Sequence, residues 1–126
     1  MTQTSAGRVG ARATPLDADV PDVPGELRID VLDTVNPTVL RIVGELEAAT
    51  APRLREELVA LAEAGETHVV IDLESMTFVD STGLGALVGG LKRFQAVFGE
   101  VVLRSPSPAA RKVLDITGLT QIFAIE

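Results

Sequence analysis

The stretch that decides the fold of this chain is Asp80-Ser81-Thr82-Gly83-Leu84-Gly85. It follows an apolar run at residues 69–73, which predicts a central strand, and it begins a helix whose apolar residues, from Leu84 to Leu91, recur at helical spacing. The stretch therefore places a serine hydroxyl on the first turn of a helix, at the carboxyl end of a strand. Its two glycines allow another backbone segment to approach closely. A serine in this position can act as a helix cap, a nucleophile or a phosphorylation site.

The composition of the chain excludes several classes of function. With 126 residues, of which 46% are hydrophobic and 23% charged, the chain is typical of one globular domain with its own core. A net charge of -7 and an aromatic content of 3% argue against a nucleic-acid partner. Cysteine is absent, which excludes disulfides, thiolate nucleophiles and cysteine-bound metals. No apolar run approaches the roughly 20 residues needed to cross a bilayer, and no signal pattern opens the chain. We therefore expect a cytoplasmic protein without membrane contact.

The hydrophobic pattern predicts an α/β domain over residues 26–126, preceded by a disordered tail over residues 1–25, where three prolines and no apolar period occur. Strands at 27–31 and 39–43 predict an antiparallel hairpin, after which the chain is expected to leave the sheet at Gly44. Further strands are expected at 68–73, 101–103 and 121–125. They alternate with helices that begin near Thr50, Ser81 and Ser107 and end near Gly65, Phe98 and Gly118.

This order predicts a mostly parallel sheet of four to five strands, with an antiparallel edge strand and three to four helices that cover both faces. In such sheets, functional groups gather at the carboxyl ends of the strands. Ser81 lies there, and Glu45 and Glu47, which follow the second strand, are expected beside it.

Nucleophilic catalysis by Ser81 does not fit the motif. A nucleophile elbow requires G-x-S-x-G, and Val79 stands where the first glycine should be. His68, the one histidine, lies at the opposite end of the preceding strand. At about 3.3 Å per residue it is well over 10 Å away, whereas proton transfer needs roughly 3 Å. We expect His68 to be a surface residue at a strand end, and the protein to have no catalytic residue and not to be an enzyme.

Cofactor and metal motifs are incomplete. Residues 83–89 miss the third glycine of G-x-G-x-x-G, because Val88 stands there, and no G-K-[ST] follows. Asp72, Glu74 and Asp80 have no fixed ligand spacing for a divalent cation. We therefore expect neither a cofactor nor a metal.

Phosphorylation offers a regulatory role for Ser81. A phosphate adds about −1.5 to −2 charges, and the N-terminus of a helix tolerates an anion because of its unpaired N–H groups and its dipole. The small neutral surface around Ser81, Gly83 and Gly85 would become bulky and anionic, so a partner packed on it would be repelled. Helix capping by Asp80 or Ser81, worth about 1 kcal/mol, is compatible with this switch. The residues alone leave both roles open.

The central stretch with its flanks resembles the signature of anti-sigma factor antagonists, the stand-alone bacterial members of the STAS (sulfate transporter and anti-sigma factor antagonist) domain family. The resemblance extends from about Leu27 to the end of the chain. It is carried by residues 70–73 and 78–89, and by Val43-Gly44-Glu45-Leu46-Glu47, Ser105-Pro106-Ser107-Pro108 and Leu114-Asp115-Ile116-Thr117-Gly118-Leu119.

The resemblance implies partner switching. In this family the unphosphorylated antagonist binds an anti-sigma factor that is also a serine kinase, and a sigma factor is released. The kinase inactivates the antagonist at the serine that maps to Ser81, and a metal-dependent serine/threonine phosphatase restores it. The same mapping assigns partner binding to the residues around that serine, namely Glu47, Asp80, Thr82, Gly83, Leu84 and Gly85.

Glu47 departs from the family, which often has aspartate there, so its role in kinase docking stays open. On this interpretation Gly83→Val should fold and dock poorly through its bulk alone, unless Gly83 has a positive φ, in which case stability would fall too. We expect the protein to be a monomer. The alternative function is a STAS scaffold or subunit in a stress-signalling complex or a membrane transport system.

Overall fold

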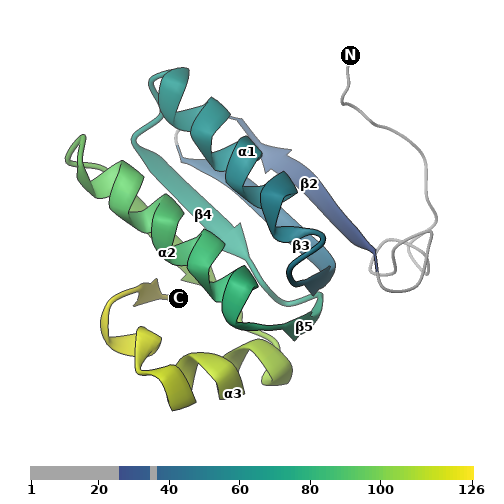
Figure 1. The fold of residues 1–126 in the computed structure, drawn as a ribbon. Helices are drawn as coiled ribbons and strands as arrows, with labels where there is room; N and C mark the ends of the chain where they lie inside the picture. The colour runs from purple at the N-terminus through teal and green to yellow at the C-terminus, as the bar shows by residue number, and fades with distance from the viewer. Residues whose placement is uncertain (1–25, 35–36) are drawn as a thin grey trace.

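The computed structural model describes residues 26–34 and 37–126, and in this part three α-helices pack on a six-stranded sheet (Figure 1). The tail predicted over residues 1–25 lies outside the described residues. The strands are β2 (Leu27–Asp33), β3 (Thr38–Leu46), β4 (His68–Asp72), β5 (Met76–Val79), β6 (Glu100–Arg104) and β7 (Ala124–Ile125). The helices are α1 (Ala51–Glu63), α2 (Ser81–Gln95) and α3 (Pro108–Thr117), followed by the 3-10 helix η1 (Leu119–Gln121).

The predicted α/β fold is confirmed. The sheet has the strand order β2-β3-β4-β6-β7, and β5 pairs with β3 beside this path. β2 is the antiparallel edge strand, and every other pairing is parallel. The sheet has six strands where the sequence predicted four to five, because the four residues of β5 were not recognised as a strand.

β3 is longer than predicted, and this extension creates the place for β5. The sequence predicted that the chain leaves the sheet at Gly44. In the structure, however, Gly44 and Glu45 remain within β3. At Gly44, whose φ of 105° suits glycine, the register shifts and the strand changes its partner from β4 to β5. The Gly44 N–H donates to the Ser75 carbonyl oxygen at 3.1 Å. Because β5 provides this new partner, β3 continues to Leu46, which is paired with Val79.

The predicted helix boundaries are confirmed for α1 and α3, and α2 is shorter than predicted. Pro52 lies in the first turn of α1, and Gly65 follows its end with a φ of 91°. Gly118, at a φ of 77°, ends α3. α2 ends at Gln95 and not near Phe98, because the chain turns so that the Gly99 N–H donates to the Phe94 carbonyl oxygen at 2.7 Å.

All three helices contribute to one core against one face of the sheet. In Figure 1, α1 and α2 lie side by side over the sheet, and a Cβ at Gly90 would come within 2.5 Å of Leu58 Cδ1, so the two helices approach closely there. The centre of this core consists of side chains at most 1% exposed: Leu40, Ile42, Ile71, Leu103, Leu54, Leu58, Leu87, Phe94 and Leu114. The prediction that helices cover both faces is wrong for the described part of the chain.

Candidate functional site at the N-terminus of helix α2

Asp80, and not Ser81, caps α2. The backbone of Asp80 is extended, with φ −115° and ψ −174°, and its Oδ1 accepts a hydrogen bond from the Gly83 N–H at 2.9 Å. The carbonyl oxygen of Asp80 accepts the first helical hydrogen bond, from the Leu84 N–H at 2.9 Å. This is the geometry of an N-cap residue, and it decides between the two capping residues that the sequence left open.

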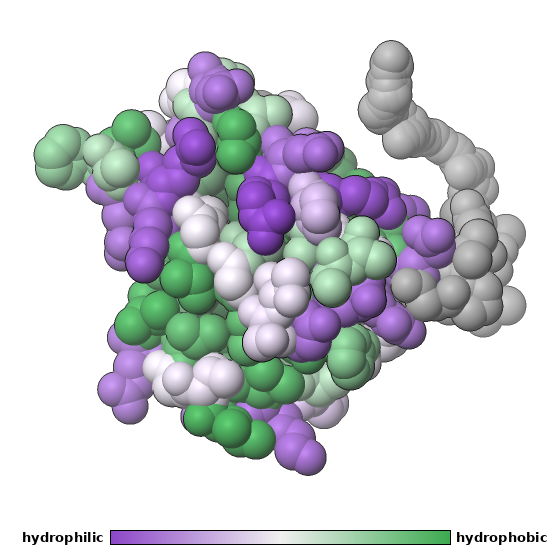
Figure 2. Space-filling model, viewed as in Figure 1, coloured by the Kyte–Doolittle hydropathy of each residue, from purple (hydrophilic) through white to green (hydrophobic). Residues whose placement is uncertain are grey.

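Ser81 is therefore the first residue of the helix, and its side chain is exposed. Among the described residues its hydroxyl has no hydrogen-bond partner. Thr82 is also exposed, and Gly85, one helical turn after Ser81, is exposed with no atom within 4 Å of the position of a Cβ. We call these three residues the Ser81 surface. Figure 2 shows pale surface, neither strongly hydrophilic nor strongly hydrophobic, over part of α2.

Gly83 and Leu84 lie beneath this surface. A Cβ at Gly83 would overlap the carbonyl oxygen of Leu46 and would lie 2.9 Å from Leu46 Cγ. Leu84 is 7% exposed and belongs to the helix-side core. The sequence predicted that another backbone segment approaches closely at a glycine. At Gly83 this segment is the end of β3, within the same chain. These two residues therefore fix the position of the helix. Their assignment to partner binding stays a prediction.

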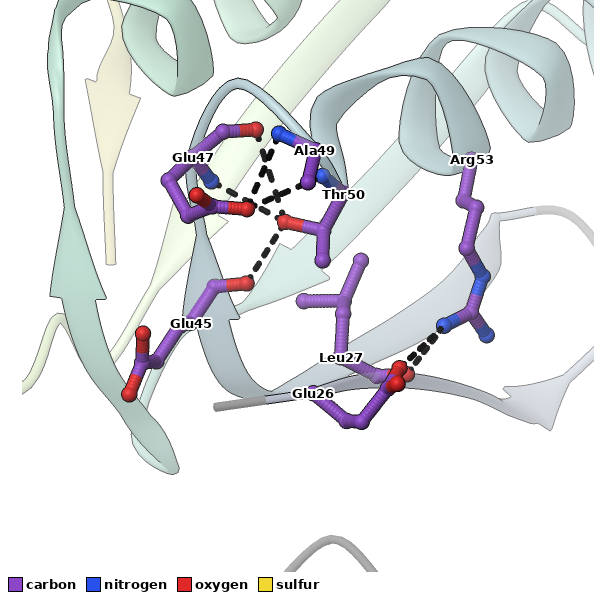
Figure 3. Close-up of polar contacts among 7 residues, drawn as sticks. All are labelled: Glu26, Leu27, Glu45, Glu47, Ala49, Thr50 and Arg53. Atoms are coloured by element: carbon purple, nitrogen blue, oxygen red, sulfur yellow. Dashed lines mark hydrogen bonds and ion pairs between the residues drawn. The ribbon is translucent and has the colours of Figure 1, made fainter. Parts of the chain in front are cut away.

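Glu47 locks the turn between β3 and α1 (Figure 3). Its Oε1 accepts hydrogen bonds from the Ala49 N–H at 2.9 Å and from the Thr50 N–H at 3.1 Å. Thr50 Oγ1 donates to the Glu45 carbonyl oxygen at 2.7 Å and accepts from the Glu47 N–H at 3.0 Å. These bonds satisfy N–H groups that precede the first turn of α1. The Glu47 carboxylate thus has a structural role within the chain.

The end of β3 meets the start of α2 through backbone contacts. The Asp80 N–H donates to the Leu46 carbonyl oxygen at 3.2 Å. One residue earlier in β3, Glu45 is paired with Phe78 of β5. Ser81 and Glu47 each follow this contact by one residue. The predicted proximity of the second strand's end to Ser81 is therefore found in the structure, although the strand that leads to Ser81 is β5 and not β4.

Sequence reasoning missed Phe78, a further residue next to this site. It lies on β5, three residues before Ser81, and 47% of its surface is exposed. The reason is that β5 itself was missed, since the sequence pattern of four residues does not alternate. The signal that was available is an aromatic residue two positions before the central stretch.

The residues considered for catalysis are not assembled. His68 is exposed at the start of β4, where its Nδ1 lies 3.0 Å from Thr67 Oγ1 and its strand partner is Glu100. This places it at the other end of the sheet from Ser81, as expected. Within residues 26–34 and 37–126, no three His, Cys, Asp or Glu side chains come together as metal ligands would. None of the described helices is long and apolar enough to cross a membrane.

Known proteins share both the sequence and the fold of this chain. The STAS domain model matches residues 27–126. The anti-sigma-B factor antagonist of Bacillus subtilis is 38% identical over 99 residues, which cover 79% of this chain and 90% of that protein. The structure of an anti-sigma factor antagonist from Mycobacterium paratuberculosis superposes with a TM-score of 0.70 at 30% identity, covering 82% of this chain and 87% of that one. The Bacillus cell fate determinant SpoIIAA in its phosphorylated form superposes with a TM-score of 0.61 at 27% identity, covering 79% and 90%. The chain therefore belongs to the STAS domain family.

Proposed function

We propose that this protein is an anti-sigma factor antagonist that is switched off by phosphorylation of Ser81. The observation that carries the proposal is the exposed Ser81 hydroxyl, which Asp80 leaves unused because Asp80 supplies the helix cap. The relatives support it, since the Bacillus subtilis relative is an anti-sigma-B factor antagonist and SpoIIAA has been solved in a phosphorylated form. The protein acts by binding and performs no chemistry of its own.

In this proposal the unphosphorylated protein binds an anti-sigma factor with serine kinase activity, and a sigma factor is released. The partner packs directly on the Ser81 surface, where Thr82 and Gly85 leave room for close contact. Asp80, Gly83 and Leu84 hold that surface in position, and Glu47 holds the adjoining turn. A metal-dependent serine/threonine phosphatase restores the active form. We place the protein in the cytoplasm, as a monomer.

The physical basis of the switch is a local change of charge and volume. A phosphate on Ser81 adds about −1.5 to −2 charges to a surface that carries none. The N-terminus of α2 stabilises this anion, so the fold survives. A partner packed on the surface would have to bury the phosphate without compensation, which is strongly unfavourable. The Glu47 carboxylate, in the segment beside Asp80, adds repulsion of the same sign.

The experiment that tests this function is intact-mass analysis of the protein after incubation with ATP and candidate anti-sigma kinases from the same cell. We expect one added phosphate, mapped to Ser81 by fragmentation and absent from Ser81→Ala. Thr82→Ala is the matched control for the site assignment, because it removes the neighbouring exposed hydroxyl and should still acquire one phosphate at Ser81. If no folded, active candidate kinase phosphorylates the protein, the alternative function as a STAS scaffold or subunit takes its place.

Binding of the same kinase provides the second readout. Ser81→Ala should bind the kinase without being inactivated, since the surface stays small and neutral. Ser81→Asp should weaken binding about tenfold or more, which corresponds to at least about 1.4 kcal/mol. Equal affinities of the two variants in a titration would contradict electrostatic switching at this surface.

A further inference from the structure

The turn after α2 presents a phenylalanine to solvent in an unfavourable backbone conformation. Phe98 is 98% exposed, and its φ is 60°. A bulky side chain rarely adopts this left-handed region, which glycine and asparagine occupy far more easily. Val97 beside it is 51% exposed. We call these two residues the hydrophobic tip, and Figure 2 shows hydrophobic surface that projects from the molecule where α2 ends in Figure 1.

Backbone hydrogen bonds fix the turn that carries the tip. The Phe98 N–H donates to the Gln95 carbonyl oxygen at 3.0 Å. The Gly99 N–H donates to the Phe94 carbonyl oxygen at 2.7 Å. A Cβ at Gly99 would overlap the Thr67 carbonyl oxygen, so the turn packs tightly against the segment before β4. The Phe98 ring is therefore held in solvent by a well-fixed backbone.

Two unfavourable features thus coincide at Phe98, a left-handed backbone and a fully exposed aromatic ring. Backbone strain of this kind is concentrated at functional sites, and aromatic side chains supply much of the binding energy where proteins meet. Ile116, by comparison, is 74% exposed but lies in the regular helix α3, without backbone strain. The coincidence at Phe98 indicates that another molecule covers its ring in a complex.

The surroundings of the tip carry an excess of positive charge. Lys92 and Arg93 are exposed in the last turn of α2, and Glu100 is exposed directly after the turn. Among residues 26–34 and 37–126, none of these three side chains has an ion-pair partner. The net charge of the whole chain is -7, so this local excess is of the opposite sign. A surface that fits the tip should combine apolar atoms with negative charge.

The chain itself has such a surface, on the side of α1 that faces away from the core. An open groove of about 360 Å³ lies there, and its lining is mostly apolar. We call it the α1 groove, and its lining residues are Pro52, Arg55, Glu56, Val59, Ala60 and Glu63. Its three charged side chains are exposed and together leave an excess of negative charge. The groove therefore complements the tip in both hydrophobicity and charge.

We propose that the hydrophobic tip of one molecule binds in the α1 groove of a second copy of this chain. Phe98 enters the apolar part of the groove. Lys92 and Arg93, at the base of the tip, approach the glutamates at the rim. The tip does not fill the groove of its own molecule, since the Phe98 ring is exposed. A hydrophobic side chain that fits a pocket elsewhere on the same kind of molecule joins copies head to tail.

This inference goes beyond the proposed function and does not depend on it. The tip lies at the opposite end of α2 from Ser81, about 22 Å away along a helix of 15 residues. The contact therefore leaves the Ser81 surface open. One side chain in one groove buries much less than the roughly 1,200 Å² of a stable interface. We expect a dissociation constant on the order of 1 mM, with the monomer predominant in dilute solution.

The first test is a concentration series of the full chain, followed by NMR of its backbone amides. We expect the signals of residues 96–99 and of α1 to shift together between about 0.05 and 2 mM, whereas those of α3 stay constant. Phe98→Asn should lose both shifts, because asparagine accepts the positive φ and keeps the turn while the ring is removed. The matched control is Ile116→Asn, which removes another exposed apolar side chain and should keep both shifts.

The unfolding temperature of each variant is measured alongside. Phe98→Asn should unfold at the temperature of the parent chain or above it, because backbone strain is relieved, so lost shifts report the missing ring and not a lost fold. Constant signals of the parent chain up to about 2 mM, or shifts that persist in Phe98→Asn, would overturn the inference. Shifts of the tip without shifts of α1 would do so as well, since the tip would then bind elsewhere.

Exchange of charges tests the pairing of tip and groove. Glu56→Lys/Glu63→Lys and Lys92→Glu/Arg93→Glu should each weaken self-association about tenfold or more, because like charges then meet. A mixture of the two variants should restore association, since the reversed tip of one meets the reversed groove of the other. Sedimentation equilibrium at matched concentrations measures this. A mixture that stays monomeric, while both variants keep the circular dichroism of the parent chain, would contradict the proposal.

Discussion

The N-termini of α2 and α3 are built alike but leave different groups available for chemistry. Each begins with a short polar cap that accepts an N–H three residues later: Asp80 from Gly83 at 2.9 Å, and Ser107 from Ala110 at 3.1 Å. In α3 the serine is itself the cap, and it is only 8% exposed. In α2 an aspartate supplies the cap, and the serine that follows is exposed. A serine at the start of a helix is thus available for modification only where another residue has taken over the capping.

The third residue of each helix differs as well. Ala110 in α3 is buried with its methyl group accommodated in the core. Gly83 in α2 has no room for such a group, because the carbonyl oxygen of Leu46 occupies the space. The start of α2 therefore packs more closely against its neighbouring segment, the end of β3, than the start of α3 packs against the core. This close fit sets the position of the Ser81 surface.

The largest effect is expected at Gly83. Gly83→Ala should lower the free energy of unfolding by about 3 kcal/mol, the upper range for a group forced into a packed site, because the obstacle is backbone and cannot rotate away. Urea denaturation followed by circular dichroism measures this loss. The control is Gly85→Ala, where nothing lies within 4 Å, and this variant should be more stable by up to about 1 kcal/mol because alanine is the better helix former. Equal stabilities of the two variants would show that the start of α2 accommodates a Cβ at Gly83, as the start of α3 does at Ala110.

A smaller effect is expected from removal of the caps. Asp80→Ala and Ser107→Ala should each lower the free energy of unfolding by about 1 kcal/mol, since each leaves an N–H in the first turn without its partner. Ser81→Ala should change it by less than about 0.5 kcal/mol, as an exposed substitution without lost contacts does. Thermal unfolding of the three variants side by side measures the difference. A loss at Ser81 as large as that at Ser107 would mean that both serines contribute to capping.

The smallest effect on stability should come from phosphorylation itself. A phosphate on Ser81 lies at a helix N-terminus, where an anion contributes about 0.3 to 1 kcal/mol. The purified phosphoprotein should therefore unfold at the same temperature as the unmodified protein or slightly above it, and this difference should shrink at high salt. A clearly lower unfolding temperature would show that the modification acts by disrupting the fold rather than by changing the Ser81 surface.

Much of the fold could be predicted because its signals are local. Ser107 followed by Pro108, and Gly118 ten residues later, predict α3 at the residues where it occurs, because capping and left-handed backbone geometry depend on a few neighbouring residues. The antiparallel hairpin of β2 and β3 follows from a short connection in the same way. β5 could not be predicted, since four residues become a strand only when the end of β3 is present to pair with them.

For the candidate site, the sequence by itself determined the central stretch, the family resemblance and the serine at the start of a helix, because these depend on the order of residues along the chain. Only the tertiary structure decided which residue caps α2, that Gly83 and Leu84 lie beneath the surface, and that Glu47 locks a turn beside it. It also decided that the helices pack on one face of the sheet. These features depend on which distant backbone atoms, such as the Leu46 carbonyl oxygen, occupy the space around each residue. Contacts of that kind exist only once the strands have paired and the helices have packed on them.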